Sequence, residues 1–174
     1  MRTGRFSKEW DEESFRALHE RTARPLWAYI THLVHDSSIA EDIVQQAYIN
    51  ILQSPTTSSL DAAHLKNYLF KTATNLANDH FRKQSHFLSV TEVDIPAPET
   101  TVDYDLTRIM TELSAKDREL LLLAYNQGLS HREIASILHY KEASVRPLLA
   151  RARARLQEIL RRHGVNVGRA RGSK

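Results

Sequence analysis

Basic side chains gather at the carboxyl-terminal end of this 174-residue chain, and arginine dominates among them. Residues 141–174 hold ten basic residues against two acidic ones, a net charge of +8, whereas residues 86–120 hold three basic residues against eight acidic ones, a net charge of −5. A guanidinium group can hold a phosphate or read the edge of a guanine with two parallel hydrogen bonds. A basic end behind an acidic middle therefore indicates a polyanionic partner at that end.

Most of these arginines lie on the second of two predicted helices, whose spacing is typical of a helix-turn-helix. Ser130 and Glu133 form a capping box that starts a short helix ending at Leu138. After a turn over 139–141, a long helix is expected over 142–162. The residues expected where the two helices touch are small or apolar: Ile134, Ala135, Leu138, Val145 and Leu149.

In a helix-turn-helix, the second helix enters the major groove of DNA and the first helix braces it across the backbone. Ser144, Arg146 and Arg151 can then face DNA. The alternative is a plain helical hairpin with a solvated basic face, although an arginine cluster on the second helix favours DNA binding.

Nine histidines raise the question of a metal site or an enzyme. His32 and His35 are three residues apart with Asp36 beside them, a passable metal arrangement. However, no glutamate completes a zincin motif, and the chain has no cysteine to supply a thiolate ligand or nucleophile. No phosphate loop, nucleophile elbow or paired-carboxylate signature is present. We therefore expect no catalytic residue, no metal and no cofactor.

The first half of the chain is also predicted to be helical. Apolar residues at three- and four-residue spacing predict four helices, over residues 10–20, 25–35, 38–53 and 62–84. Ser38 with Glu41 predicts a capping box for the third helix, and Asp61 can cap the fourth. Residues 54–59 form a loop by composition.

Further helices are expected over 103–113 and over 115–125, the latter capped by Ser114 and stopped at Gln127-Gly128. Between the halves, acids and two prolines predict a flexible linker that lets the domains move independently. With only five glycines and five prolines, the chain is predicted to be all-α, with two small helical domains. The expected boundaries are a first domain over 10–85, the linker over 86–102, a second domain over 103–163 and a basic tail over 164–174.

Four stretches of the chain carry a family resemblance: AEDIVQQAYI over 40–49, LKNYLFKTATNLANDHFRK over 65–83, LSAKDRELLLL over 113–123 and GLSHREIA over 128–135. In this order, with an acidic linker between the halves, they resemble the extracytoplasmic-function (group 4) sigma factors of the sigma-70 family. The first two are similar to regions 2.2 to 2.4 of that family. The last two, with the arginine-rich helix, are similar to region 4.

The resemblance implies a sigma factor that binds core RNA polymerase and directs promoter-specific initiation. The region-2.2 helix of the family docks on the clamp coiled coil of the polymerase β′ subunit. This assigns Asp42, Ile43, Gln45 and Gln46 to polymerase binding. The family often has Gln-Glu where this chain has Gln45-Gln46, so one charged contact is missing.

The next helix and the loop before it, over 58–63, are implied to melt and read the −10 element. Amides can read exposed base edges, aromatic rings can stack on bases and cations can hold the backbone. The residues assigned to this element are Tyr68, Lys71, Asn75, Asn78, Asp79, Arg82 and Lys83. Asn75 stands near the position that captures a flipped base. Tyr68 stands where the family usually has Trp, and it is either a stacking residue or part of the core.

The last helix is implied to read the −35 element. The residues assigned to it are Lys141, Ser144, Arg146, Arg151, Arg153 and Arg155. The chain departs from the family pattern twice, because Leu148 replaces a cation and Pro147 lies inside the expected helix. A proline there lacks an N–H and clashes with the carbonyl of Ala143, which costs about 3 kcal/mol unless the first turn absorbs it.

The expected partners are core RNA polymerase, through its β′ clamp and β flap, promoter DNA and an anti-sigma factor. No apolar run approaches the roughly 20 residues that span a bilayer, so we expect a cytoplasmic protein without membrane insertion. Two other classes remain open. A helix-turn-helix regulator independent of sigma activity should carry a receiver-like α/β domain upstream, and a helical adaptor with a basic tail should not depend on polymerase.

Overall fold

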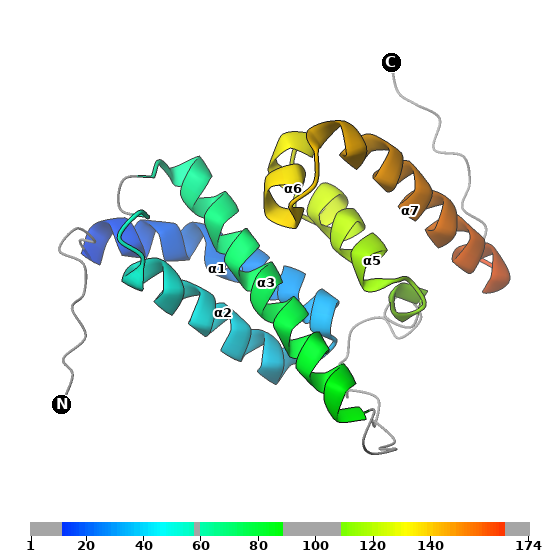
Figure 1. The fold of residues 1–174 in the computed structure, drawn as a ribbon, viewed down its shortest axis with the longest axis horizontal. Coiled ribbons are helices and arrows are strands. Elements are labelled where there is room, and N and C mark those ends of the chain that lie inside the picture. Colours follow the sequence, from blue (N-terminus) through cyan, green and yellow to red (C-terminus); the bar gives the residue numbers. More distant parts are fainter. Residues whose placement is uncertain (1–11, 58–59, 89–108, 166–174) are drawn as a thin grey trace.

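The computed structural model describes residues 12–57, 60–88 and 109–165, and all regular elements in these ranges are helices (Figure 1). The all-α prediction is thus confirmed. The elements are α1 (Glu12–Val34), α2 (Ser37–Gln53), α3 (Ala62–Leu88), α5 (Ala115–Leu121), the π-helical turn η1 (Leu122–Asn126), α6 (His131–Leu138) and α7 (Glu142–Arg162).

Helices α1, α2 and α3 pack on one another as the first domain. Their apolar stripes supply its core, including Leu26, Ile30, Leu33, Ala47, Ile51, Leu69 and Ala73. Two buried hydroxyl pairs cross between helices: Thr22 Oγ1 lies 2.7 Å from Tyr48 Oη, and Tyr29 Oη lies 3.0 Å from Thr74 Oγ1. Since each threonine hydroxyl donates to a backbone carbonyl of its own helix, the tyrosine donates in both pairs.

Helix α1 is continuous through Pro25, so the prediction of two helices over 10–20 and 25–35 is wrong. The buried positions Leu18, Thr22 and Leu26 follow one another at four-residue spacing across the expected break. Residues 21–24 must stay helical to keep this face buried. Packing on both sides of Pro25 therefore outweighs the roughly 3 kcal/mol that an interior proline costs.

The cap of α2 is Asp36, so the predicted Ser38–Glu41 capping box is also wrong. Asp36 Oδ1 accepts hydrogen bonds from the backbone N–H groups of Ser38 (2.8 Å) and Ile39 (3.0 Å). His35 ends α1 in the left-handed region (φ 59°), which leaves Asp36 as the last residue before α2. By contrast, Asp61 caps α3 as predicted, and α3 continues to Leu88, four residues past its expected end.

In the second domain, short-range signals place the helix ends as predicted. Ser114 Oγ accepts from the backbone of Asp117, and Gly128 follows η1 with φ 63°. The capping box of Ser130 and Glu133 is present, and His139 adopts φ 56° in the turn before α7. The helix expected from 103 lies mostly outside the described residues, and only its last turn, at 109–111, is seen.

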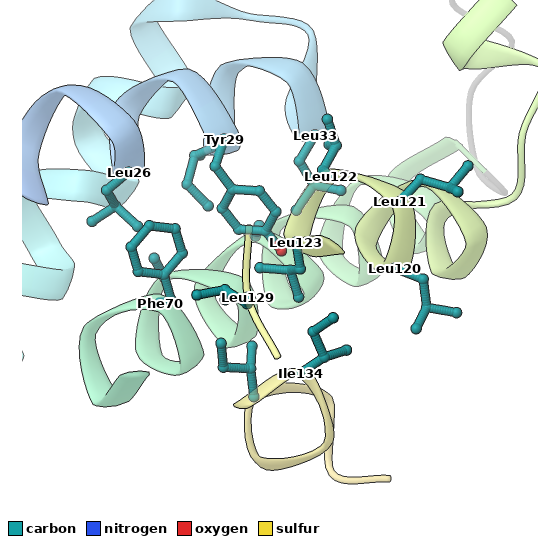
Figure 2. Packing of buried hydrophobic residues seen from close by; sticks show 14 of the residues in the cluster. Leu26, Tyr29, Leu33, Phe70, Leu120, Leu121, Leu122, Leu123, Leu129 and Ile134 are labelled. Atoms are coloured by element: carbon teal, nitrogen blue, oxygen red, sulfur yellow. The ribbon is translucent and has the colours of Figure 1, made fainter. Parts of the chain in front are cut away.

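The two domains lie against each other, whereas independent movement was expected. Helix α3 packs on α6, and α1 packs on α5 and η1. Figure 2 shows Tyr29 and Leu33 of α1 beside Leu122 and Leu123 of the second domain, with Leu26 next to Phe70 of α3. The buried residues of both domains form one continuous cluster, so burial of apolar surface holds the domains together. Residues 89–108, which include most of the linker, lie outside the described part.

Candidate nucleic-acid and polymerase interfaces

The outward face of α2 carries three of the four residues assigned to polymerase binding. Asp42, Gln45 and Gln46 are exposed, whereas Ile43 is only 7% exposed and belongs to the core. Ile43 therefore packs into the core beneath α2, and its side chain is not available to contact a partner. Ile49 is 43% exposed on the same outward face, three residues beyond Gln46. Its place among polar neighbours follows from helical spacing, but the sequence alone does not distinguish Ile49 from the buried isoleucines of the same helix.

The residues assigned to the −10 element follow one face of α3. Asn75, Asn78, Asp79 and Lys83 are exposed, as is Arg82, which pairs with Asp79 at 3.0 Å. An exposed pair of this kind contributes at most about 1 kcal/mol, so a phosphate can replace Asp79 at little cost.

Two further residues of this set are half-buried, and they lie nearer the amino-terminal end of α3. Tyr68 packs against the hydrophobic cluster, so at least part of its ring belongs to the core. Lys71 is also half-buried. The loop residues Ser58 and Ser59 lie outside the described part of the chain.

The same face of α3 borders the second domain. A cavity of about 350 Å³ separates Thr74, Asn75 and Asn78 from the other side, which includes Glu119 and Tyr140. The Glu119 carboxylate is 4% exposed and accepts a hydrogen bond from the Asn78 side chain. Burial raises the pKa of Glu119, against the effects of the Asn78 hydrogen bond and of the nearby Lys116.

Helix α7 presents most of its predicted DNA-binding residues to solvent. Lys141, Arg146, Arg151 and Arg153 are exposed, and Ser144 is half-buried near the start of the helix. Exposed guanidinium groups on one helix provide both phosphate contacts and base-edge donors. The geometry of α7 therefore fits a recognition helix.

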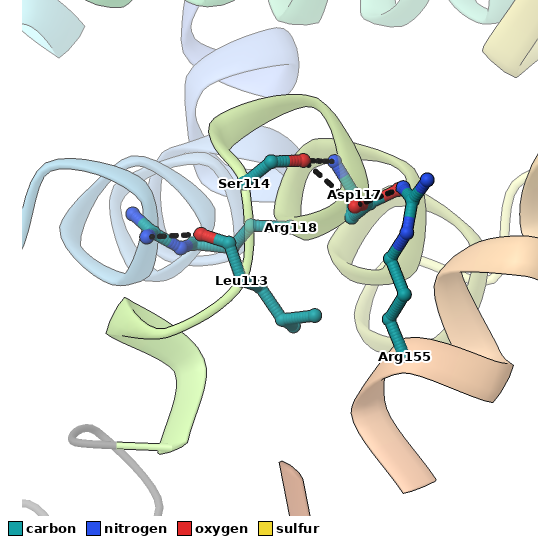
Figure 3. Close-up of polar contacts among 5 residues, drawn as sticks. All are labelled: Leu113, Ser114, Asp117, Arg118 and Arg155. Atoms are coloured by element: carbon teal, nitrogen blue, oxygen red, sulfur yellow. Dashed lines mark hydrogen bonds and ion pairs between the residues drawn. The ribbon is translucent and has the colours of Figure 1, made fainter. Parts of the chain in front are cut away.

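Arg155 is exposed as well, with a side chain 60% accessible, but its guanidinium pairs with a carboxylate of the second domain. Its Nη1 donates to both carboxylate oxygens of Asp117, at 2.9 and 2.6 Å (Figure 3). The Asp117 side chain is only 7% exposed, and its Oδ2 also accepts from Ser114 Oγ at 2.7 Å. This pair joins the start of α5 to the middle of α7 and helps to hold the two helices together.

Pro147 lies inside a helix that runs without interruption from Glu142 to Arg162. Pro147 itself is exposed, whereas Leu148 is half-buried and packs against the hydrophobic cluster. The residue that replaces the family's cation therefore packs inward. The exposed face of α7 therefore carries one cation fewer at this position than the family pattern implies.

Arg118 is a buried cation that no motif in the sequence marks. It is 7% exposed, and its Nη1 donates to the carbonyl of Leu33 in the first domain at 3.0 Å. Its other nitrogens donate to the carbonyls of Met110 (2.9 Å), Leu113 (3.2 Å; Figure 3) and Thr111 (3.4 Å). Burial lowers the pKa of Arg118, so these carbonyl groups carry much of its stabilisation.

The histidines do not gather with acidic residues into a metal site in the described ranges, where no group of three or more such side chains occurs. His35 lies beside Arg118, and its buried Nε2 has no hydrogen-bond partner among the described residues. Burial, the Arg118 charge and His32 lower the pKa of His35 to about 4. No helix in the described part is both long and apolar enough to cross a bilayer.

A helical bundle joined to a helix-turn-helix with an arginine-rich second helix defines a two-domain, DNA-binding transcription protein. The family models "Sigma-70 region 2" and "Sigma-70, region 4" match residues 18–87 and 103–156. The ECF RNA polymerase sigma factor SigM of Bacillus subtilis is 29% identical over 163 residues, which cover 86% of this chain and 96% of SigM. SigL of Mycobacterium tuberculosis is 30% identical over 161 residues, with coverages of 86% and 90%.

Solved structures agree with these relatives. The sigma factor RpoE of Bartonella quintana, crystallised with the anti-sigma factor NepR, superposes with a TM-score of 0.71 at 25% identity and covers 86% of this chain and 98% of RpoE. The chain belongs to the extracytoplasmic-function group of the sigma-70 family. As a sigma factor, it binds core RNA polymerase and directs promoter-specific transcription initiation. A sigma-independent regulator or an adaptor is not favoured, because both halves of the chain match.

Proposed function

We propose that three helices of this sigma factor each provide a separate binding surface. Helix α2 docks on the β′ clamp, α3 reads and melts the −10 element, and α7 reads the −35 element. The observation that carries this proposal is that each helix keeps its apolar stripe buried and turns its assigned polar residues outward. Asp42, Asn75 and Arg151 are all exposed on their respective helices. Ile43 and Arg155 are left out, because one is in the core and the other is paired with Asp117.

On α2, the docking surface consists of Asp42, Gln45, Gln46 and Ile49. Asp42, Gln46 and Ile49 follow one another at helical spacing, so they share one face. An exposed isoleucine within a polar ring has the arrangement of a protein interface, in which an apolar centre is closed off from water by a polar rim. Two side-chain hydrogen bonds, Gln45 to Glu41 and Gln46 to Asn50, order this face before any partner binds.

On α3, an exposed amide at Asn75 can read the edge of a base that has left the duplex. Lys71, Arg82 and Lys83 lie along the same helix and can hold the backbone of a single strand. The charges position the strand and the amide distinguishes bases. Promoter melting is thus assigned to the first domain.

In the second domain, duplex recognition belongs to Lys141, Ser144, Arg146, Arg151 and Arg153. The β flap is the partner proposed for this domain in the polymerase. RpoE binds the anti-sigma factor NepR, and we assign an anti-sigma partner to this chain by analogy. The site of action would be the cytoplasm, where polymerase and promoters meet.

Holoenzyme assembly tests the assignment of α2, and permanganate footprinting of a promoter bubble tests that of α3. The Asp42→Ala, Gln45→Ala double variant should weaken binding to core polymerase without loss of helicity, whereas Glu13→Ala, an exposed acid on α1, should not. Asn75→Ala should assemble normally but open promoters poorly and with relaxed −10 preference, because it removes an amide and no charge. Normal assembly by the double variant would refute the docking surface, and normal opening by Asn75→Ala would refute the −10 assignment.

A further inference from the structure

His64, in the first turn of α3, is an exposed side chain outside the set assigned to the −10 element, and it is held in one orientation. Its Nδ1 lies 2.8 Å from Asp61 Oδ1, the same oxygen that accepts from the backbone N–H groups of Ala63 (3.0 Å) and His64 (2.9 Å). The Asp61 carboxylate therefore caps the helix and fixes the imidazole ring at the same time. The ring stays open to solvent, because 71% of the side chain is exposed.

The contact with Asp61 determines which hydrogen bonds the free edge of the ring can make. An ionised carboxylate only accepts hydrogen bonds, so Nδ1 must carry a proton. In the neutral imidazole the other nitrogen, Nε2, is then an acceptor. Hydrogen bonds from the His64 backbone and side chain lower the pKa of Asp61, so the carboxylate stays ionised and keeps this role. His64 thus presents one oriented hydrogen-bond acceptor to solvent.

His64 lies on the same face of α3 as the residues assigned to the −10 element. Tyr68, Lys71 and Asn75 follow it at intervals of four, three and four residues, which is the spacing of one helical face. At about 1.5 Å per residue, His64 is about 16 Å from Asn75 along the helix axis. Neighbouring nucleotides of a stacked strand lie about 3.4 Å apart, so the two side chains reach different nucleotides.

We propose that His64, positioned by Asp61, is a second base-reading side chain of α3, and that its Nε2 accepts a hydrogen bond from the exocyclic amino group of adenine or cytosine. The inference rests on the proposed function of α3, to which it adds one base contact. Guanine and thymine carry a carbonyl oxygen at the corresponding place, and an oxygen cannot donate to Nε2. His64 therefore distinguishes adenine and cytosine from guanine and thymine, and Asp61 is its positioning residue.

Three substitutions separate the acceptor from the ring and from the helix cap. His64→Phe keeps a planar ring that can stack on a base but has no acceptor. Asp61→Ser keeps a good N-cap residue, whereas its hydroxyl is too short to hold the imidazole. His19→Phe makes the same change at an exposed histidine of α1 and is the matched control. Circular dichroism and assembly with core polymerase show whether each variant is folded.

The full chain is assembled with core RNA polymerase on templates randomised across the −10 region, and the templates retained in heparin-resistant open complexes are sequenced. The wild type should prefer adenine or cytosine at one position whose preference Asn75→Ala leaves unchanged. His64→Phe should reduce that preference about three- to tenfold, the range that one net hydrogen bond provides, and Asp61→Ser should reduce it less. His19→Phe should match the wild type.

A preference that survives in His64→Phe would overturn the proposal, because stacking would then be sufficient. A loss of opening that is equal for all sequences would overturn it too, since it would indicate a contact with the DNA backbone. An unchanged preference in Asp61→Ser would contradict the positioning role of Asp61. If Asn75→Ala relaxes the preference at its own position while His64→Phe changes none, the proposed function of α3 stands without His64. If the wild type shows no preference anywhere, both fail.

Discussion

The guanidinium of Arg118 donates a hydrogen bond of 3.0 Å to the carbonyl of Leu33, which lies 85 positions earlier in the chain. The Leu33 carbonyl belongs to the last turn of α1, whose final carbonyl groups have no partner within the helix. Arg118 thus caps a helix of one domain from within the other. A single buried cation serves both the fold of the second domain and its attachment to the first.

Replacing Arg118 by Ala should destabilise the chain by about 3–5 kcal/mol, because several buried carbonyls lose their donor at once. Urea denaturation followed by circular dichroism measures this loss. Arg16→Ala removes an exposed pair with Glu12 on α1 and should cost less than about 0.5 kcal/mol. Equal effects of the two substitutions would contradict the structural role of Arg118.

Arg151 and Arg155 lie one helical turn apart on α7, yet they should respond differently in DNA binding. Arg151→Ala removes an exposed cation, so the log–log slope of affinity against salt should fall by about 0.9 for a lost phosphate contact. Arg155→Ala should leave that slope nearly unchanged and lower stability instead, since its charge is held by Asp117. Duplex binding by the full chain at several salt concentrations separates the two, and a slope change for Arg155→Ala alone would reverse the assignment.

Pro147→Ala should stabilise the chain by about 1–3 kcal/mol, because α7 regains a backbone donor for the carbonyl of Ala143 and loses a steric clash. Thermal denaturation at a fixed pH measures the change. Pro55→Ala, in the loop after α2, should have the opposite sign and a smaller size, because there proline restricts the unfolded chain. A loss of stability in Pro147→Ala would mean that the ring makes contacts that α7 needs.

His35 should make stability depend on pH. Its pKa is about 4 in the folded chain against 6.5 ordinarily, so between these values the unfolded chain binds a proton that the folded chain does not. The stabilisation is complete above about pH 6.5 and is lost as the pH falls toward 4. His35→Asn, which tolerates φ 59°, should show a shallower decline in unfolding free energy over this window. An equally steep decline would assign the effect to other groups.

The features that the sequence predicted correctly depend on residues that lie close together in the chain. Asp61, Ser114 and Ser130 cap helices because the groups that they bind lie two or three residues away. Asp36 took the place of Ser38 because the backbone at His35 decides where α2 begins, and a left-handed residue other than glycine is not visible in the sequence.

Long-range pairs could not be predicted in this way. The partner of Arg155 is 38 residues away, and that of Arg118 in the first domain is 85 residues away. No spacing rule links such positions, so an arginine that holds the fold looks the same as one that faces DNA. The same reason explains why Ile43 and Ile49 could not be told apart until the face of α2 that packs on α1 was known.

Run-off transcription from a promoter library measures most directly whether this chain directs polymerase to particular promoters. Purified chain is added to bacterial core RNA polymerase, and transcript start sites are mapped by sequencing. We expect transcript starts that appear only with the chain and share one −35 and one −10 sequence, and Asn75→Ala should relax the −10 preference. Stable binding to core polymerase without chain-dependent starts, or starts that share no upstream sequence, would contradict this expectation.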